Sequence, residues 1–422
     1  MIPYVIHFEL YTSLIIACLV LLIGHFFIAK SKLLRHYSIP EPVVGGLLIA
    51  VLVLIARQFN LNISFDNSFQ NPLMLAFFGT LGLSADLSTL RAGGKTLVLF
   101  LAAIVGLLIL QNTLGIVLAK AFNLDGVMGV ILGSITLSGG HGTATGWSDP
   151  LILEHGIKAA KELGIAGATF GLILGCLIGG PVGRYLISTV KNLPKEIAQK
   201  LNENENELDK VQEDENAPVM MYETIEKISR ITPLNFIQTL LLLVISMYIG
   251  NLVTPYLKIY MGSYGTFTIP TFVSVLFTAV ILNNTLSFTK LYKMHARSVA
   301  TIGNVSLILF LSFALMTLKL WELANLAIPM IVILIAQALL MASYAILVTF
   351  RVMGSDYNAA VMAAGHCGFG MGATPTAIVN MQAITQRFGP SKIAFLIVPM
   401  VGAFFVDLIN ALLIPIFIMF AA

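Results

Sequence analysis

Two glycine-rich stretches hold most of the residues in this 422-residue chain whose types and spacing suggest ligand binding. The first reads Ser-Gly-Gly-His-Gly-Thr-Ala-Thr-Gly over residues 138–146, and the second reads Gly-His-Cys-Gly-Phe-Gly-Met-Gly-Ala-Thr-Pro-Thr over residues 365–376. Each interrupts an apolar run, although glycine at this density weakens a helix. In lipid, bare backbone N–H and C=O groups are tolerated only where they line a cavity or lie buried in protein. The pair therefore predicts a solute-binding site within a membrane.

A helix that stops and restarts at such a stretch offers two kinds of backbone ligand. The restarted N-terminus presents unpaired N–H groups and the positive end of the helix dipole, and both favour an anion. The stopped C-terminus presents carbonyl oxygens, which are suitable ligands for a small cation such as Na⁺. Hydroxyl groups at Thr143, Thr145, Thr374 and Thr376 can serve either ligand. These residue types predict an anionic solute whose binding is coupled to Na⁺.

Asp407 is the most informative charged residue, because it lies deep in the last apolar run. Asn410 follows three residues later and so shares its helical face. A carboxylate inside a membrane span is expensive and usually marks an ion or substrate path. We expect Asp407 to receive a substrate ammonium group or Na⁺. The alternative is a carboxylate that is protonated or tied into a structural hydrogen-bond network.

The candidate residues form two overlapping sets. The expected substrate contacts are Gly140, His141, Gly142, Thr143, Thr145, Gly372, Thr374, Thr376, Asp407 and Asn410. The expected Na⁺ contacts are Ser138, Gly139, Thr143, Gly368, Gly370, Thr374 and Asp407. Two alternatives stay open: the glycines only permit close helix packing, and the histidines at 141 and 366 are neutral and brace their segments through hydrogen bonds.

Composition sets the class of protein that must position these residues. Hydrophobic residues make up 57% of the chain and charged residues only 11%, which excludes a soluble domain of this size. Ten apolar runs have about the length that a membrane helix requires. They fall near 14–29, 41–57, 72–90, 96–118, 164–189, 233–253, 267–287, 300–318, 325–349 and 391–420. The sequence therefore predicts an all-α polytopic membrane protein, and its small net charge of +3 gives no basic block for a nucleic-acid partner.

The runs divide the chain into two halves of five spans each, residues 1–190 and 231–422. A hydrophilic connector, residues 191–230, joins them. The glycine-rich segments, about 126–150 and 355–385, each fall between the fourth and fifth span of a half. Because Gly, Pro and polar residues break them too often for a simple span, we predict helix-break-helix hairpins that enter the membrane and return.

The two halves also repeat each other in sequence. A Leu-x-Leu-Ser-x-x-Leu-x-Thr-Leu-basic pattern begins at Leu81 and again at Leu309, and Pro42 and Pro270 share this displacement along the chain. The Gly-His pairs that end at His141 and His366 follow at nearly the same displacement. An odd number of spans per half requires the second half to be inserted upside down. Inverted repeats with broken elements are typical of secondary transporters, whose substrate lies between the repeats.

Lysine and arginine counts predict the orientation. With the N-terminus outside, 18 of the 24 basic residues fall on one face and 6 on the other. Leaving out the six on the connector and its flanks still gives 12 against 6. Because basic residues favour the cytoplasmic face, we expect both termini on the outer, periplasmic side and the connector in the cytoplasm.

These motifs, with Phe-Phe-Val-Asp-Leu-Ile-Asn at 404–410, resemble the glutamate:sodium symporter family of bacteria. The resemblance covers essentially the whole chain. It implies uptake of L-glutamate coupled to Na⁺ across the bacterial inner membrane, no cofactor beyond the coupling ion, a homodimer, and elevator-like movement of a transport domain against a scaffold domain. It assigns no individual ligand atom, so the residue roles above are predictions from residue type.

Other functions remain to be separated from this one. A di- or tricarboxylate as substrate, or a proton as coupling ion, fits the same residues. An intramembrane enzyme would need a motif such as His-Glu-x-x-His or Gly-x-Ser-x-Gly, or paired intramembrane aspartates, and the sequence contains none of these. A channel differs in its kinetics, because saturable and stereoselective uptake driven by an ion gradient excludes an open pore.

Overall fold

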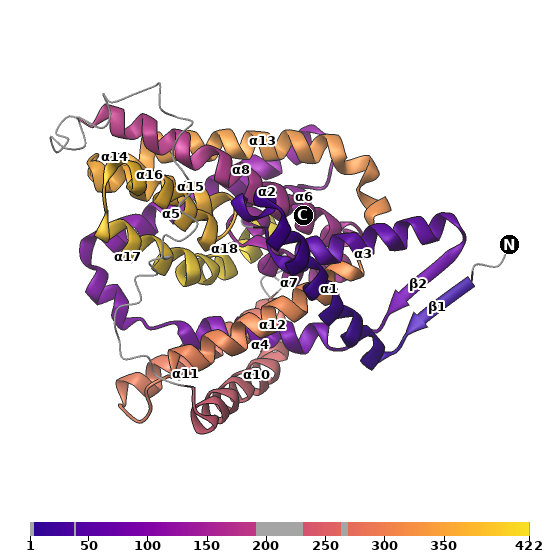
Figure 1. The fold of residues 1–422 in the computed structure, drawn as a ribbon. Helices are drawn as coiled ribbons and strands as arrows, with labels where there is room; N and C mark the ends of the chain where they lie inside the picture. The colour runs from indigo at the N-terminus through magenta and orange to yellow at the C-terminus, as the bar shows by residue number, and fades with distance from the viewer. Residues whose placement is uncertain (1–3, 38, 191–230, 263–268, 422) are drawn as a thin grey trace.

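The computed structural model describes residues 4–37, 39–190, 231–262 and 269–421, and it is mainly helical (Figure 1). The predicted connector, residues 191–230, lies outside the described residues. Within the described ranges, eight helices are long and apolar enough to cross a bilayer. The chain is accordingly a polytopic helical membrane protein.

The first half contains the following elements, in order: β1 (Tyr4–Phe8), α1 (Leu10–Lys30), α2 (Lys32–His36), α3 (Glu41–Gln58), β2 (Leu61–Phe65), α4 (Gln70–Ser84), α5 (Ser88–Ala121), α6 (Gly126–Val130), the π-helical segment η1 (Ile131–Ile135), α7 (Gly140–His155) and α8 (Ala160–Thr189). Helix α5 is bent near its start, where Gly94 has a φ of 57°. The eight candidate spans include α1, α3, α8 and the part of α5 from Gly94 to Ala121.

The second half contains α10 (Pro233–Gly262), α11 (Thr271–Phe288), α12 (Ala296–Met316), η2 (Leu320–Leu326), α13 (Ala327–Tyr344), η3 (Ala345–Thr349), α14 (Phe350–Val352), α15 (Tyr357–Met371), α16 (Thr374–Phe388), α17 (Lys392–Met400), η4 (Val401–Phe405) and α18 (Val406–Ala421). Its candidate spans are Pro233–Leu257, α11, α12 and the continuous stretch Ala327–Val352.

Two of the ten predicted runs differ from single long helices. The run 72–90 ends as a helix at Ser84, because the amides of Asn283 and Asn284 both donate to Ala85 O, at 2.9 and 2.8 Å. These two hydrogen bonds link α11 to the end of α4. The run 391–420 is divided into α17, η4 and α18, and the π-helical η4 directly precedes Asp407.

A two-stranded parallel sheet is the one departure from helical structure among the described ranges. Strand β1 pairs with β2 from Tyr4 opposite Leu61 to Phe8 opposite Phe65, and it projects from the helices (Figure 1). The rings of Phe8 and Phe65 stack at 5.5 Å. The structure is otherwise mainly helical, as an all-α membrane protein is expected to be. The strand pairing joins segments on either side of α1, α2 and α3, so no local sequence pattern predicts it.

The helices pack in two groups that both draw on both halves. In the first, α1 packs on α3, α10 on α11, α12 on α3, and α4 on both α11 and α12. In the second, α8 packs on α7, α13, α15 and α16, while α5 packs on α6, η1 and α13. Each half therefore contributes its first three long helices to one group and its later helices, with the glycine-rich segment, to the other.

Glycines allow the closest helix contacts. A Cβ built on Gly115 of α5 would overlap the carbonyl of Gly129 in α6, and one on Gly129 would overlap the carbonyl of Gly115. Gly24 of α1 and Gly45 of α3 meet backbone across their interface in the same way. The small-residue packing that we kept as an alternative for the glycine-rich stretches is therefore present in these other helix pairs.

We expect Gly129→Val to lower the melting temperature of the purified protein, because the added side chain overlaps backbone and costs about 1–3 kcal/mol. The matched control is Gly180→Ala in α8, where a Cβ meets nothing within 4 Å outside its own helix. Alanine there is favoured by roughly 0.5–1 kcal/mol over glycine. A thermal unfolding curve in which Gly129→Val melts at or above the temperature of Gly180→Ala would contradict the packing.

Candidate functional site

Both glycine-rich segments fold as two helical arms with a break between them. The first arm of the first segment begins with Asp125, whose carboxylate accepts from Val127 N, and it consists of α6 and η1. The helix ends in a turn at Ser138 and Gly139, which we call the first break, and α7 begins at Gly140. Gly140 has a φ of 64°, a left-handed conformation that favours glycine.

The second segment has the same plan. Asp356 caps α15, with its carboxylate accepting from Ala359 N at 2.7 Å. The helix ends at Met371, and the second break comprises Gly372 and Ala373. Helix α16 then starts at Thr374, with a proline in its first turn, where the missing N–H removes no helical hydrogen bond. The predicted breaks are thus present in both segments.

The two breaks lie against each other. Ser138 Oγ donates to Gln111 Oε1 at 2.8 Å and lies 3.3 Å from Gly370 O. Gln111 Nε2 donates to the same Gly370 carbonyl at 2.7 Å. A Cβ built on Gly140 would stand 3.3 Å from Gly372 O. Since α7 and α16 both begin at this junction, the positive ends of two helix dipoles converge on it.

Asp407 lies beside the first segment, at the start of α18. Thr143 Oγ1 points to Asp407 Oδ1 at 3.4 Å, a long hydrogen bond. One turn later, Asn410 Nδ2 donates to Ser134 O at 2.9 Å. Asn410 is fully buried, and its Oδ1 has no hydrogen-bond partner in the structure. The shared helical face predicted for Asp407 and Asn410 is therefore turned toward the first glycine-rich segment.

The other polar residues of the first segment make structural contacts in this conformation. His141 Nε2 lies 3.0 Å from Thr169 Oγ1 of α8, and only 7% of the histidine is exposed. Thr145 Oγ1 donates to His141 O, in its own helix, at 2.8 Å. A Cβ on Gly142 would meet the Phe77 ring at 2.9 Å. These residues fix α7 against its neighbours.

The second segment is more deeply enclosed. A Cβ built on Gly402 of η4 would lie 3.2 Å from Thr374 Oγ1, so this hydroxyl faces the stretch that leads to Asp407. Thr376 is fully buried. Gly368 packs directly on the backbone of Ala377 in α16, and Gly370 O already accepts two hydrogen bonds. Of the predicted residues in this segment, Gly370 contacts Ser138 of the first segment, and Gly372 lies next to Gly140.

The two Gly-His pairs are not equivalent in structure. His141 follows its break and lies in the second arm, whereas His366 precedes its break and lies in the first arm. His366 is fully buried, with Nδ1 2.9 Å from Thr349 Oγ1 and its ring stacked on Phe369 at 5.0 Å. These contacts fit the bracing role. The two Gly-His pairs are related by nearly the same spacing along the chain as the other repeated motifs. Their histidines nevertheless occupy different positions in the fold.

Gln111, Asn112 and Ser134 were not among the predicted site residues. Gln111 joins the two breaks, and Asn112 Oδ1 accepts from Ser134 N at 2.9 Å, where Gly133 departs from helical geometry. Adjacent polar residues inside the apolar run 96–118 were the available signal, because a buried amide needs partners. The apolar context alone does not tell which segment those amides face.

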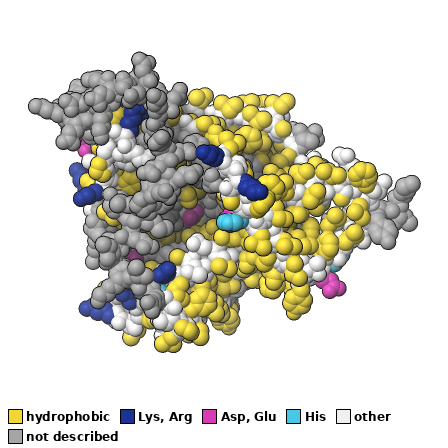
Figure 2. Space-filling view, in the orientation of Figure 1, with side chains coloured by type: hydrophobic (Ala, Val, Ile, Leu, Met, Phe, Trp, Pro, Cys, Tyr) yellow, Lys and Arg dark blue, Asp and Glu magenta, His cyan; other side chains and the backbone are white. Residues whose placement is uncertain are grey.

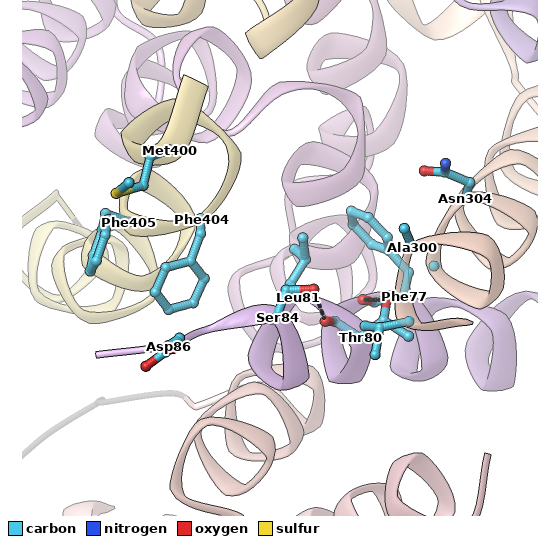
Figure 3. A pocket seen from close by; sticks show the side chains of 12 residues that line it. Phe77, Thr80, Leu81, Ser84, Asp86, Ala300, Asn304, Met400, Phe404 and Phe405 are labelled. Atoms are coloured by element: carbon cyan, nitrogen blue, oxygen red, sulfur yellow. Dashed lines mark hydrogen bonds between the residues drawn. The ribbon is translucent and has the colours of Figure 1, made fainter. Parts of the chain in front are cut away.

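A cavity of about 340 Å³ adjoins the site, within the range of small-molecule pockets. Met400, Phe404 and Phe405 project from the end of α17 and from η4, and α4 and α12 form the opposite side with Thr80, Leu81 and Asn304 (Figure 3). Phe77 lines the cavity and lies next to Gly142, and Phe405 is two residues from Asp407. The cavity thus separates the first helix group from the segment that carries Asp407.

Comparison with known proteins identifies the chain's relatives. A family model described as sodium/glutamate symporter matches residues 6–390. The chain is 49% identical over 417 residues to the sodium/glutamate symporter of Escherichia coli strain K12, covering 98% of each chain. It is 43% identical over 411 residues to that of Haemophilus influenzae, covering 97% of each. A transporter rather than an enzyme is therefore confirmed, and the chain belongs to the sodium/glutamate symporter family.

Proposed function

We propose that this chain is a secondary active transporter that carries L-glutamate into the cell together with Na⁺ by alternating access. Membership of the sodium/glutamate symporter family supports the substrate and the coupling ion. The main structural support for the proposal is that the two helix breaks lie against each other beside Asp407. A solute held there is bound by both halves of the chain.

The substrate is an anion with one amino group, and the site offers a partner for each charge. The N-termini of α7 and α16 favour the two carboxylates of glutamate, with help from the hydroxyls of Thr143 and Thr374. Asp407 receives the ammonium group, since Thr143 already turns toward that carboxylate. His141, Thr145, Thr376 and Asn410 support the site from behind, because each is at least nine-tenths buried.

Na⁺ binds near the ends of the stopped helices. Freed carbonyls around Ser138, Gly139, Gly368 and Gly370 are candidate ligands, together with the side chains of Thr143, Thr374 and Asp407. Gly370 O accepts from Gln111 and Ser138 in this conformation, so it can bind a cation only after those donors turn away. A bound Na⁺ offsets the charge of Asp407 and of the substrate before the loaded site moves.

We infer that the two halves are inverted repeats, each with a re-entrant hairpin. The aspartate caps at Asp125 and Asp356, each beginning a segment that breaks and restarts, support the repeat. The first helix group would be the scaffold domain and the second the transport domain of an elevator-like movement. The few packing contacts between the groups, such as α12 with α7 and α4 with η4, support this division.

The transporter lies in the bacterial inner membrane, as a homodimer, with both termini in the periplasm. Apolar side chains cover most of the described surface in the right part of the view, and Lys and Arg gather mainly toward the left edge (Figure 2). That edge contains the ends of α11, α14 and α17 (Figure 1), which the basic count assigns to the cytoplasm. Each net positive charge moved inward gains about 2.3 kcal/mol per 100 mV of membrane potential.

We expect Asp407→Asn to abolish Na⁺-dependent uptake of radiolabelled L-glutamate in proteoliposomes, because the neutral amide cannot balance an ammonium group or Na⁺. The matched control is Asp125→Asn, which changes an exposed cap to an equally good capping residue. Both variants should elute as the native protein does in size-exclusion chromatography. Near-normal uptake by Asp407→Asn would remove this residue from the site.

A panel of solutes and ions tests the substrate. We expect L-glutamate to be taken up in preference to D-glutamate, succinate and citrate, because the site holds a carboxylate for an ammonium group as well as N–H groups for an anion. Replacement of external Na⁺ by K⁺ should abolish uptake, and a proton gradient alone should not restore it. Faster uptake of a di- or tricarboxylate without an amino group would identify a different substrate.

A further inference from the structure

The cavity beside η4 continues toward one face of the molecule. A second cavity, of about 450 Å³, shares Ser84, Asp86 and Val299 with the first. Its lining includes Lys290 and Lys293, which follow the end of α11. The two cavities together extend from Phe404 and Phe405, close to Asp407, to Lys290 and Lys293 after the end of α11. Figure 3 shows the first of these cavities.

Helix α12 borders this passage only along its first turns. Val299, Ala300, Gly303 and Asn304 line the first cavity, and all lie in the first half of the helix, which starts at Ala296. Arg297 lies at the same end. The passage therefore opens at the end of α12 where basic residues gather, which the proposed topology places at the cytoplasmic face.

The other end of α12 is bonded to the second helix group. Lys161 Nζ of α8 donates to Thr317 Oγ1 at 2.7 Å. Glu162, which is 4% exposed, accepts from Lys319 N at 3.0 Å. We call these two hydrogen bonds the outer contact. They link consecutive residues at the start of α8 to the residues that directly follow α12.

Apolar packing seals the same end. Ile165 of α8, one turn after Lys161, is 5% exposed and belongs to a buried cluster with Val43 of α3 and Leu311 and Leu315 of α12. The two helix groups are thus in close contact at one end of α12 and separated by a cavity at the other. Beside the segment that carries Asp407, the space between the two groups is therefore occupied by cavities toward one face and by packed side chains toward the other.

We propose that the two cavities form the cytoplasmic half of the transport path, and that the outer contact closes the path on the periplasmic side. The structure is then the inward-open state, and the Lys161–Thr317 and Glu162–Lys319 bonds must break before the outward-open state can form. This inference rests on the proposed function for the direction of transport. Its structural part, a passage on one face and a closure on the other, can be measured without glutamate.

Cysteine labelling tests the passage. The three native cysteines, Cys18, Cys176 and Cys367, are first replaced by alanine, and Asn304→Cys is then added. A membrane-impermeant maleimide should label this variant at least tenfold faster in inside-out than in right-side-out vesicles. The matched control is Val305→Cys, one residue along α12 but absent from the cavity lining, and it should remain unlabelled in both. Equal labelling from both sides, or labelling of Val305→Cys at the same rate, would overturn the passage.

A second pair of variants tests the outer contact. Ile165→Cys reports on the closed end, and Thr317→Val removes the acceptor of Lys161 with almost no change in shape. Because hydrogen bonds to charged groups contribute substantially, Thr317→Val should raise labelling of Ile165→Cys from the periplasmic side on the order of tenfold. It should also lower labelling of Asn304→Cys from the cytoplasmic side. The control Thr301→Val removes a hydroxyl that bonds only its own helix, at Arg297 O, and should change neither rate.

Opposite changes in the two rates separate a shift between states from unfolding, which would raise both. If Thr317→Val raises both, Glu162→Met decides in the same assay, because methionine keeps the approximate size of the side chain but has no oxygen that could accept from Lys319 N. Unchanged rates in both variants would overturn the role of the outer contact. Loss of sided labelling with intact Na⁺-dependent uptake removes only this inference. Sided labelling without glutamate uptake keeps the path and refutes the proposed substrate.

Discussion

Backbone that leaves the helix inside a membrane must find hydrogen-bond partners within the protein, and the centre of this fold is built around that requirement. Gln111 meets it near the end of α15, because its side-chain amide donates to the carbonyl of Gly370, and it also accepts from the hydroxyl of Ser138 in the first break. Its own carbonyl accepts from Gln337 of α13. The next residue, Asn112, accepts from Ser134 where η1 is distorted. Two adjacent amides on α5 thus fix both segments of the site.

The need for hydrogen-bond partners within the protein also explains which features of the structure the sequence alone could predict. Apolar runs and glycine-rich interruptions predicted the helices and the two breaks, because these depend on local composition. The division of the helices into two groups depends on contacts between distant segments, such as α4 with α11. The role of Gln111 depends on which carbonyl its amide reaches. The two histidines are not equivalent in the structure, because the matching Gly-His dipeptides lie on different arms of the two glycine-rich segments.

The proposed repeat is approximate, and the departures from it lie at the candidate site. The segments share an aspartate cap, a break and a restarted helix, but only the first contains a π-helical stretch. The position related to Asp407 by the displacement between Leu81 and Leu309 is Gly179, where a Cβ would collide with the amide of Asn380 in α16. A carboxylate therefore has no room at the related position. In the proposed site, one acidic group without a counterpart in the other half would give the site a direction, as an asymmetric solute requires.

The small parallel sheet constrains how the chain enters the membrane. Strands β1 and β2 are hydrogen-bonded neighbours, so residues 4–8 and 61–65 must end on the same side of the bilayer. The chain between them contains α1 and α3 as its two long apolar helices. The pairing is satisfied only if α1 and α3 together return the chain to the face on which β1 lies, whichever face that is. Strand pairing thus reports on the topology of the first helical hairpin independently of the distribution of charge.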